Sequence, residues 1–500
     1  MMRPPIAQRR MNRRGFLDAL AAGAAAWTAG TMTRRTSAAA EASARGPNIV
    51  LLFADDMGYG DPRCFQPQSK CPTPNIDRLA AEGIKLTDAH APVGLCVPSR
   101  YGLMTGRYPF RSQGYRLRDG EVTVAAVLKS AGYRTAMVGK WHLGFRYPPG
   151  RKGQTDVRAG DVLAGGPVDR GFDSYFGIPA SLDIPPYYYI ENDRPVEPPT
   201  GTIADSNTPG WTKIQGAFWR GGGIAPGFRH DEVLPTFRDR ALEVLDKHAA
   251  AGDGKPLFLY LALPAPHTPW LPAEEYRGRS GASLYGDFVA QVDGVIGDVL
   301  ARLDKLGMTD DTLVVFTSDN GPVWYPQDVE KYGHASVGPL RGMKADVWEG
   351  GNRMPFVARW PGHVKPASES DETICFTDIL ATFAQVAGAP VPDGAGEDSF
   401  SFAPVLLGRK LPGPLRKFTI LQSGRGTWAV RQGHWKLILA TDGGGFSKRV
   451  KPGPNDPKGQ LYDLSVDVGE RKNLYAERPD IVARLTALLD SARKAPRTAE

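Results

Sequence analysis

Four short apolar runs in this 500-residue chain lead directly into charged or metal-competent side chains. The runs are NIVLLFA (48–54), TAMVG (135–139), PLFLYLALP (256–264) and TLVVFTS (312–318), and they lead to Asp55 and Asp56, Lys140 and His142, His267, and Asp319 and Asn320. Amphipathic helical stretches lie between the runs, for example at 237–250 and 288–307. Continuous apolar strands that alternate with helices predict an α/β fold with a mostly parallel sheet covered on both faces. Because ligands bind beyond the carboxyl ends of such strands, we expect these side chains to form one site.

The segment GLCVPSRYGLMTGR (94–107) adds a cysteine to this picture. Pro98 suits the first turn of a helix, where its missing N–H is not needed, and Gly106 suits the end of that helix. Cys96 would then lie just before a helix N-terminus, which favours anions. A cysteine phosphatase loop is excluded, because it needs a longer separation between cysteine and arginine than the three residues between Cys96 and Arg100.

CVPSR followed by YGLMTGR resembles the signature of the type I sulfatases, in which C-x-P-S-R directs oxidation of the cysteine to formylglycine. The match falls on Cys96, Pro98, Ser99, Arg100, Leu103, Thr105, Gly106 and Arg107. Other stretches are similar to sulfatase landmarks in the expected order: NIVLLFADDMGYGD (48–61), TPNIDRLAAEG (73–83), GKWHLG (139–144), GFDSYFG (171–177), PHTPW (266–270), TSDNG (317–321) and GPLRGMKADVWEGGNRMP (338–355). The resemblance covers about residues 46–475. It implies an arylsulfatase-like hydrolase of sulfate esters with an alkaline-phosphatase-like large domain.

Four of the strand-end side chains could bind a metal ion. Asp55, Asp56, Asp319 and Asn320 offer hard oxygen ligands, which suit calcium first and magnesium second. A bare pair of aspartates would by itself support only a hydrogen-bonded turn. The resemblance implies that these four residues and the modified Cys96 hold one calcium ion. Asn320 also speaks against a metallophosphatase or phosphonate hydrolase of the same superfamily, in which histidine commonly follows this aspartate.

The resemblance implies a proton-transfer role for three side chains around the formylglycine hydrate. One hydroxyl of the hydrate at Cys96 attacks sulfur while the alcohol leaves, and the other hydroxyl then collapses to the aldehyde and expels sulfate. Asp319 takes the proton from the attacking hydroxyl, and His267 protonates the leaving oxygen. His142 takes the proton that releases sulfate.

Three cations complete the expected site. Arg100 lies four residues after Cys96, so it can reach back over the first helical turn, and the resemblance implies that it fixes the formylglycine. Lys140 follows a buried strand and Lys344 lies in a Gly-rich run, although most lysines are merely solvated. We expect both lysines to bind sulfate oxygens. Lys140 should also help Arg100 to orient the hydrate.

The sequence leaves open which alcohol carries the sulfate group in the natural substrate. The stretch 180–194 carries Asp183 and Tyr187, which could hydrogen-bond and stack on a sugar, although a proline-stiffened loop packed on the core fits equally well. His334 precedes the Lys344 run and could line the substrate pocket. We expect a sulfated carbohydrate rather than a small aryl ester. A phosphonate or phosphate-diester hydrolase and an unmodified sulfoglycan-binding protein are the competing hypotheses.

Residues 1–45 are predicted to be an export signal of the twin-arginine type and not part of the fold. Arg13 and Arg14 precede an apolar stretch and then small residues that suit a signal peptidase, so we expect a periplasmic or secreted protein. This segment carries eight arginines and two acidic residues. Removing them from 61 basic and 54 acidic residues leaves 53 against 52, which gives no reason to expect nucleic acid or a membrane surface as partner. The remainder has no apolar run of about 18 residues, so no membrane span is expected.

The remaining cysteines suggest no second reactive centre. Cys64 and Cys71 are close enough in sequence to bridge across a loop in an oxidising compartment, and the sequence leaves this open. Cys375 lies in an apolar run and is interpreted as a packed thiol. A formylglycine-generating enzyme is the partner that the Cys96 signature implies.

The chain is predicted to have two domains after the signal. Residues 46–415 are expected to form the catalytic domain and residues 416–500 a smaller unit. The resemblance implies that the smaller unit closes the cleft, although a purely structural cap fits as well. In the smaller unit, the short alternating stretches FTILQ, TWAVRQ, HWKLILA and QLYDLS predict an antiparallel sheet, and DIVARLTALLDSARK predicts a helix packed against it.

Overall fold

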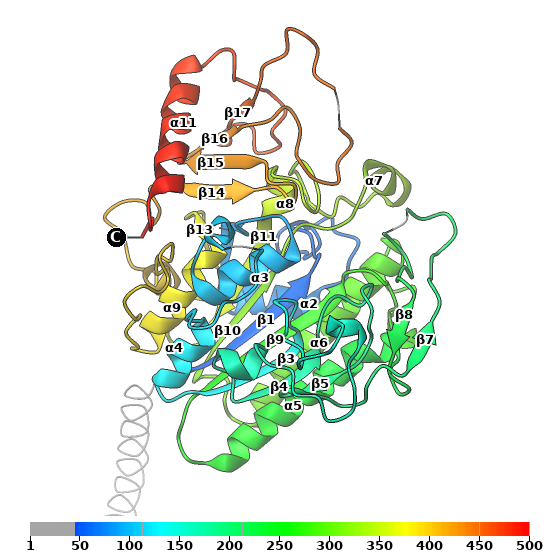
Figure 1. The fold of residues 1–500 in the computed structure, drawn as a ribbon. Helices are drawn as coiled ribbons and strands as arrows, with labels where there is room; N and C mark the ends of the chain where they lie inside the picture. Colours follow the sequence, from blue (N-terminus) through cyan, green and yellow to red (C-terminus); the bar gives the residue numbers. More distant parts are fainter. Residues whose placement is uncertain (1–45, 113, 213, 450, 500) are drawn as a thin grey trace, which may run out of the picture.

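The computed structural model describes residues 46–112, 114–212, 214–449 and 451–499, so the expected export signal lies outside the described residues. Its largest element is an eleven-stranded sheet within this described part, in the order β12-β2-β11-β10-β1-β9-β3-β4-β5-β6, with β13 paired to β2 (Figure 1). The strands are β1 (Asn48–Asp55), β2 (Ile84–His90), β3 (Arg134–Lys140), β4 (Ser174–Ile178), β5 (Ile190–Glu191), β6 (Arg194–Pro195), β9 (Leu257–Pro266), β10 (Thr312–Ser318), β11 (Arg353–Arg359), β12 (Ser368–Ser370) and β13 (Ile374–Cys375). The mostly parallel sheet expected from the sequence is confirmed.

The four apolar runs singled out in the sequence form adjacent strands at the centre of this sheet. The strands β10, β1, β9 and β3 lie side by side and are all parallel. Nearly every residue in them is buried, which explains why their sequences are continuously apolar rather than alternating. On the other side of β10, the antiparallel strand β11 connects this parallel core to β2.

Helices cover both faces of the sheet (Figure 1). The long helices α5 (Val233–Ala251) and α6 (Ser283–Lys305) pack on β9 and on each other, with α2 (Pro74–Ala81) beside α6. The other face carries α3 (Cys96–Thr105), α4 (Val124–Ser130) and α9 (Ile379–Val386), which contact one another. Among the described residues, no helix combines the length and apolar composition needed to cross a membrane.

The carboxyl-terminal part forms a separate small sheet, drawn in orange and red in Figure 1. Its antiparallel strands are β14 (Thr419–Gln422), β15 (Trp428–Gln432), β16 (Trp435–Ile438) and β17 (Gln460–Asp463). Helix α11 (Pro479–Lys494) packs Leu485 and Leu489 against Val430 and Leu437 of this sheet. The antiparallel sheet with a packed helix is therefore confirmed. We use the name C-terminal unit for residues 416–499.

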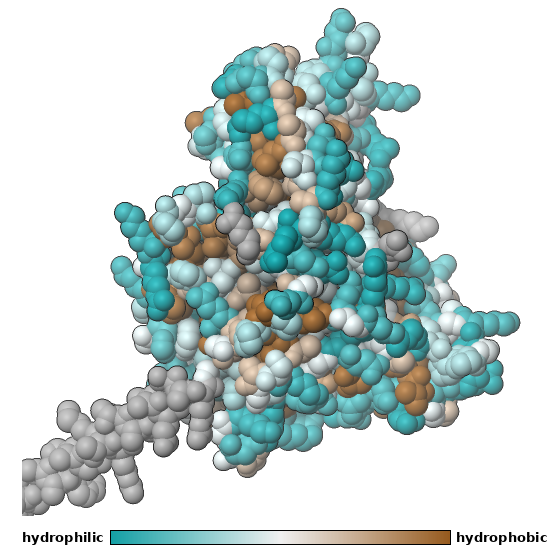
Figure 2. Space-filling model, turned by 60° about the vertical axis from the view of Figure 1, so that its left-hand side comes forward, coloured by the Kyte–Doolittle hydropathy of each residue, from teal (hydrophilic) through white to brown (hydrophobic). Residues whose placement is uncertain are grey.

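Further short helices and one strand pair lie in the connections between these elements. They are the β7 (Gly201–Ile203) and β8 (Gly222–Ile224) pair and the helices α7 (Pro326–Tyr332), α8 (Glu349–Asn352) and α10 (Ala403–Leu406). The face drawn in Figure 2 is mainly hydrophilic, and its apolar side chains form small separate groups. Cys64, Cys71, Cys96 and Cys375 are all free thiols, so the structure contains no bridge between the first two.

Candidate active site

The carboxyl ends of the four central strands bring the predicted side chains to one edge of the sheet. Asp55 is the last residue of β1 and Lys140 is the last residue of β3. His267 directly follows β9, and Asp319 directly follows β10. Parallel neighbours end at the same edge, so these four side chains meet because of the strand order.

The acidic side chains of the site are paired with buried cations. One guanidinium nitrogen of Arg100, Nη2, lies 3.2 Å from Asp55 Oδ2 and 2.9 Å from Asp319 Oδ2. The Lys140 ammonium group donates a hydrogen bond to Asp55 as well. Arg100 and Lys140 are almost completely buried, so neither cation is a surface residue.

A second group of contacts forms around Asp56. Lys344 Nζ lies 2.6 Å from Asp56 Oδ1, and Asn320 Nδ2 donates a hydrogen bond of 2.6 Å to the same oxygen. The backbone N–H of Asp56 donates to Asp319 Oδ1 at 3.1 Å, which connects the ends of β1 and β10. Asp56 has a positive φ of 65°, which turns the chain sharply just after β1.

Cys96 is the first residue of α3 and lies beside Asp55 and Asp319. The helix begins two residues earlier than the position of Pro98 suggested, because Leu95 has extended backbone and its carbonyl accepts the N–H of Ser99 at 3.0 Å. It ends at Gly106 with a φ of 65°, as predicted. A ligand atom of Cys96 and one each of Asp55 and Asp319 all lie within 4.8 Å of one another.

Burial and charge set the protonation states of these groups. Burial raises the pKa of the Cys96 thiol despite the nearby Lys140 and Lys344. An unmodified Cys96 would therefore be protonated at neutral pH and a poor nucleophile. Burial alone would raise the pKa of Asp55, but Lys140, His267 and Arg100 hold it well below its usual range. Burial and the neighbouring Asp55 raise the pKa of Asp319 to about 6.

The two histidines differ in their environments. His267 Nδ1 lies 2.6 Å from the carbonyl oxygen of Thr268, which places the proton on Nδ1 and leaves Nε2 facing the acidic group. His142 has a positive φ of 61°, and its Nδ1 is buried without a partner. Burial and Lys140 hold the pKa of His142 well below its usual range, so this ring is neutral at neutral pH.

The donor set fits a hard divalent cation. Asp55 Oδ1 and Asn320 Oδ1 are buried oxygens without any hydrogen-bond donor. Asp55 belongs to two groups of residues whose possible ligand atoms lie within 4.8 Å of one another. One group also contains Asp56 and His267, and the other also contains Cys96 and Asp319. Carboxylate and amide oxygens without donors are the ligands that calcium prefers.

Sequence comparisons agree with this geometry. The family model described as "Sulfatase" matches residues 47–389. An N-acetylgalactosamine-6-O-sulfatase from Bacteroides thetaiotaomicron is 34% identical over 489 residues, covering 89% of this chain and 93% of the relative. Human arylsulfatase A is 35% identical over 471 residues, covering 87% of this chain and 85% of the relative.

The chain belongs to the sulfatase family. It is an enzyme that hydrolyses sulfate esters, which decides against the competing hypotheses of a phosphonate hydrolase and of a non-catalytic binding protein. A solved structure from work on glycosaminoglycan metabolism by Bacteroides thetaiotaomicron superposes with a TM-score of 0.78 at 31% identity, covering 90% of this sulfatase and all of that chain. A sulfatase structure from Pseudoalteromonas sp. has a TM-score of 0.68 at 23% identity, covering 91% and 92% of the two chains, and shares the fold.

The three residues predicted to line the substrate pocket are buried in this sulfatase. Tyr187 is 2% exposed, and its hydroxyl donates to the carbonyl oxygen of Arg220 at 2.6 Å. Asp183 forms an ion pair with the Arg220 guanidinium. His334 is 1% exposed and lies 2.8 Å from Asp61. In this structure each of the three side chains is held by a contact within the fold, and their place in the substrate pocket stays a prediction.

Two residues near the site were not singled out from the sequence. Tyr260 lies in β9, and its hydroxyl is 3.5 Å from Arg100 Nη1. The ring of Phe53 lies 5.1 Å from the centre of the Arg100 guanidinium. The hydroxyl-bearing tyrosine in the otherwise apolar stretch LFLYLAL was the one signal that could have identified Tyr260.

Proposed function

We propose that this sulfatase releases sulfate from a sulfated carbohydrate through a formylglycine hydrate formed from Cys96. The observation that carries this proposal is the position of Cys96 at the start of α3, beside Asp55 and Asp319. The C-x-P-S-R sequence supplies the maturation signal, so a formylglycine-generating enzyme would act on the chain before it is active.

One calcium ion would be held by Asp55, Asp56, Asp319, Asn320 and the modified Cys96. The buried, unpaired oxygens of Asp55 and Asn320 support this ligand set. When bound, the ion supplies positive charge that stabilises the sulfate oxygens and the charge that develops during transfer.

Three side chains would move protons during the reaction. Asp319, whose carboxylate lies with Asp55 and Cys96 in one group of possible ligand atoms, accepts the proton of the attacking hydroxyl. His267 presents Nε2 to the site. Because Nδ1 already donates to the Thr268 carbonyl, the acid form is the doubly protonated ring, which gives its Nε2 proton to the leaving alcohol oxygen and becomes neutral. His142, which is neutral, accepts the second hydroxyl proton when sulfate is released.

Buried cations would bind the sulfate and orient the hydrate. Lys140 and Lys344 contribute point charges for the sulfate oxygens, and both already lie against the carboxylates of the site. Arg100 lies one turn after Cys96 in α3 and spans Asp55 and Asp319, so it can hold the hydrate in a fixed orientation. Such preorganised charges commonly provide the largest part of catalysis.

The substrate class is inferred from relatives. One relative is named an N-acetylgalactosamine-6-O-sulfatase, and a structural neighbour comes from work on glycosaminoglycans. We therefore expect a sulfated glycan, with a 6-O-sulfated amino sugar as the first candidate. We also propose residues 46–415 as the catalytic domain, residues 416–500 as the closing unit, and export through residues 1–45 to the periplasm or the medium.

Sulfate release from a panel of sulfated mono- and disaccharides tests the substrate class. The panel should include 6-O-sulfated N-acetylgalactosamine, the same sugar sulfated at another position, and nitrophenyl sulfate. The proposal expects the highest kcat/KM on one of the sugars. A higher value on nitrophenyl sulfate than on every sugar would contradict it.

A further inference from the structure

The loop that carries Lys344 is held from two sides. This Lys344 loop, residues 338–348, is the last part of the connection from α7 to α8. The catalytic side holds it through the N–H of Lys344, which donates to the Pro322 carbonyl at 2.9 Å, and the N–H of Ala345, which donates to the Gly94 carbonyl at 2.6 Å. Ala345 has a positive φ of 68°, a strained conformation for a residue with a side chain.

The C-terminal unit holds the opposite side of the same turn. The N–H of Gly424 donates to the Ala345 carbonyl at 2.7 Å, and the N–H of Val347 donates to the Gly443 carbonyl at 2.8 Å. These contacts join the two residues that flank Asp346 to two separate turns of the C-terminal unit.

The Asp346 carboxylate accepts hydrogen bonds from both the Lys344 loop and the C-terminal unit. It is fully buried, and its Oδ2 accepts the N–H of Met343 at 2.9 Å. The Ser447 hydroxyl donates to the same oxygen, and the Ser447 N–H donates to Oδ1 at 3.3 Å. One carboxylate thus links the residue before Lys344 to the C-terminal unit.

The backbone of the C-terminal unit packs closely against the Lys344 loop at Gly445. A Cβ added to Gly445 would lie 2.2 Å from the carbonyl carbon of Ala345 and 2.2 Å from the nitrogen of Asp346. The backbone of the C-terminal unit therefore contacts the backbone of the Lys344 loop at Ala345 and Asp346, the two residues that follow Lys344.

A buried ion cluster fixes the far end of the loop. Glu349, the first residue of α8, lies 2.8 Å from Lys436 Nζ, and its N–H donates to Glu470 Oε2 at 2.7 Å. Lys436 and Glu470 belong to the C-terminal unit, and all three residues are completely buried. Arg341 at the other end donates to the Glu470 carbonyl at 2.8 Å.

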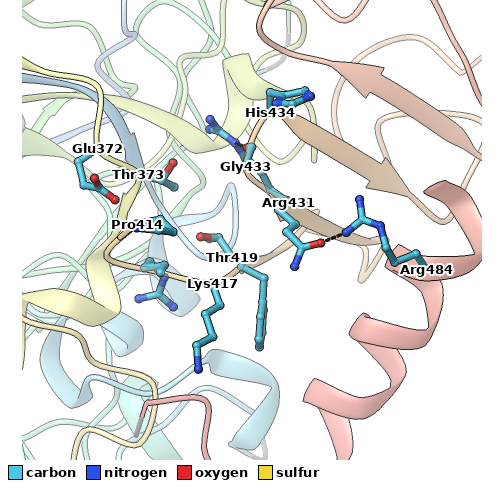
Figure 3. A pocket seen from close by; sticks show the side chains of 12 residues that line it. Glu372, Thr373, Pro414, Lys417, Thr419, Arg431, Gly433, His434 and Arg484 are labelled. Carbon is cyan, nitrogen blue, oxygen red and sulfur yellow. Dashed lines mark hydrogen bonds between the residues drawn. The ribbon is translucent and has the colours of Figure 1, made fainter. Parts of the chain in front are cut away.

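A cleft of about 480 Å³ lies between the C-terminal unit and the rest of the chain, where Glu372, Thr373 and Pro414 form part of its wall (Figure 3). Its lining includes Thr419, Gln432 and Arg484, so it opens at the end of the small sheet where Thr419 pairs with Arg431. The turn that touches Ala345 follows the opposite end, where Gln422 pairs with Trp428. The contacts with the Lys344 loop are therefore separate from this cleft.

We propose that Asp346 and Ser447 are positioning residues that hold Lys344 in its sulfate-binding place, so that the C-terminal unit completes the active site. This inference rests on the proposed role of Lys344. Displacing a charged group by about 1 Å can cost on the order of 100-fold, which is the scale of effect available to such a contact.

The test compares Ser447→Ala with Ser447→Thr in mature, calcium-loaded enzyme, with inorganic sulfate as the binding probe. Ser447→Ala should weaken sulfate binding roughly 10- to 100-fold and lower kcat/KM similarly. Ser447→Thr keeps the hydroxyl and should restore most of the affinity. Ser465→Ala is the matched control, because its hydroxyl contacts only Asp463 on the surface of the same unit. Gly445→Ala should act like Ser447→Ala, whereas Gly413→Ala has open space around it and should be neutral.

A double-variant cycle separates positioning from general destabilisation. If Ser447 acts through Lys344, then adding Ser447→Ala to Lys344→Ala should cause no further loss of sulfate affinity. The same fold loss in both backgrounds, or unchanged affinity in Ser447→Ala, would overturn the positioning role and leave the proposed function intact. An unchanged affinity in Lys344→Ala would instead refute the proposed role of Lys344, and the positioning role with it.

Discussion

His267 Nε2 lies 3.7 Å from Asp56 Oδ2, at the centre of the strand-end site. The other ring nitrogen is engaged by the Thr268 carbonyl, so the ring can neither rotate freely nor present its second nitrogen to the site. A histidine held in this way has only Nε2 available for the substrate. When the ring is doubly protonated, this nitrogen carries the proton that a general acid donates.

Replacing His267 should therefore have an effect that depends on the leaving group. His267→Ala is expected to lose roughly 10²- to 10⁴-fold in kcat/KM on a sulfated sugar, because a sugar alkoxide needs a proton to leave. The loss on nitrophenyl sulfate should be much smaller, since nitrophenolate is a good leaving group. Steady-state assays on both substrates measure this, with exposed His363→Ala as the control. Equal losses on the two substrates would rule out the acid role.

His142→Ala should block the reaction after the alcohol has left. The variant is expected to give a burst of about one nitrophenolate per enzyme and then stall, because no neutral base accepts the hydroxyl proton that releases sulfate. Rapid-mixing kinetics and intact-mass analysis would detect the burst and a sulfated enzyme. Slow turnover without a burst and without bound sulfate would contradict the assigned step.

Calcium should control both activity and stability. Chelation is expected to abolish turnover and added calcium to restore it. Calcium at about 100 times its Kd should stabilise the fold by roughly 2.7 kcal/mol, because the ion binds only the folded site. Thermal melting with and without calcium measures this shift, and Asp319→Ala should remove most of it. Full activity in enzyme shown by elemental analysis to be metal-free would refute the calcium requirement.

The buried Lys436 should be important for stability. It lies between Glu349 and Glu470, and burial would raise the pKa of Glu349 if Lys436, Arg353 and His90 did not hold it well below its usual range. Lys436→Met removes the cation that Glu349 and Glu470 share and leaves their buried negative charge only partly compensated, which should cost about 3–5 kcal/mol. Urea denaturation compared with Lys448→Met, an exposed control in the same unit, tests this. A cost below about 1 kcal/mol, the range of surface pairs, would show that the cluster is not stabilising.

The central strands were predictable because each is a continuous apolar run that ends in a polar residue. TLVVFTS forms β10 with the predicted bounds, and NIVLLFA forms β1 with only Asp55 added. Their parallel order then explains why Asp55, Lys140 and Asp319 meet without any further information. Gly106 likewise marked the end of α3, whereas its start depended on the backbone of Leu95, for which the sequence gives no signal.

Contacts between distant parts of the chain were not predictable in the same way. The Asp346–Ser447 contact joins residues 101 positions apart, and neither residue belongs to a periodic pattern. The free state of Cys71 was also beyond the sequence, because it depends on a fold that places its sulfur 3.6 Å from His334 Nε2. Tyrosine serves both for stacking on a sugar and for packing in a core, so the sequence could not show that the Tyr187 side chain is buried, and its contact with a sugar stays a prediction.

The mass of the Cys96 peptide in active enzyme tests the central claim most directly. Enzyme produced with a formylglycine-generating enzyme should contain a Cys96 residue about 18 Da lighter than cysteine, in proportion to its activity. Cys96→Ala, produced in the same way, should lose at least about a thousandfold in turnover, since it has no nucleophile. Fully active enzyme whose peptide map shows only unmodified Cys96 would contradict the account.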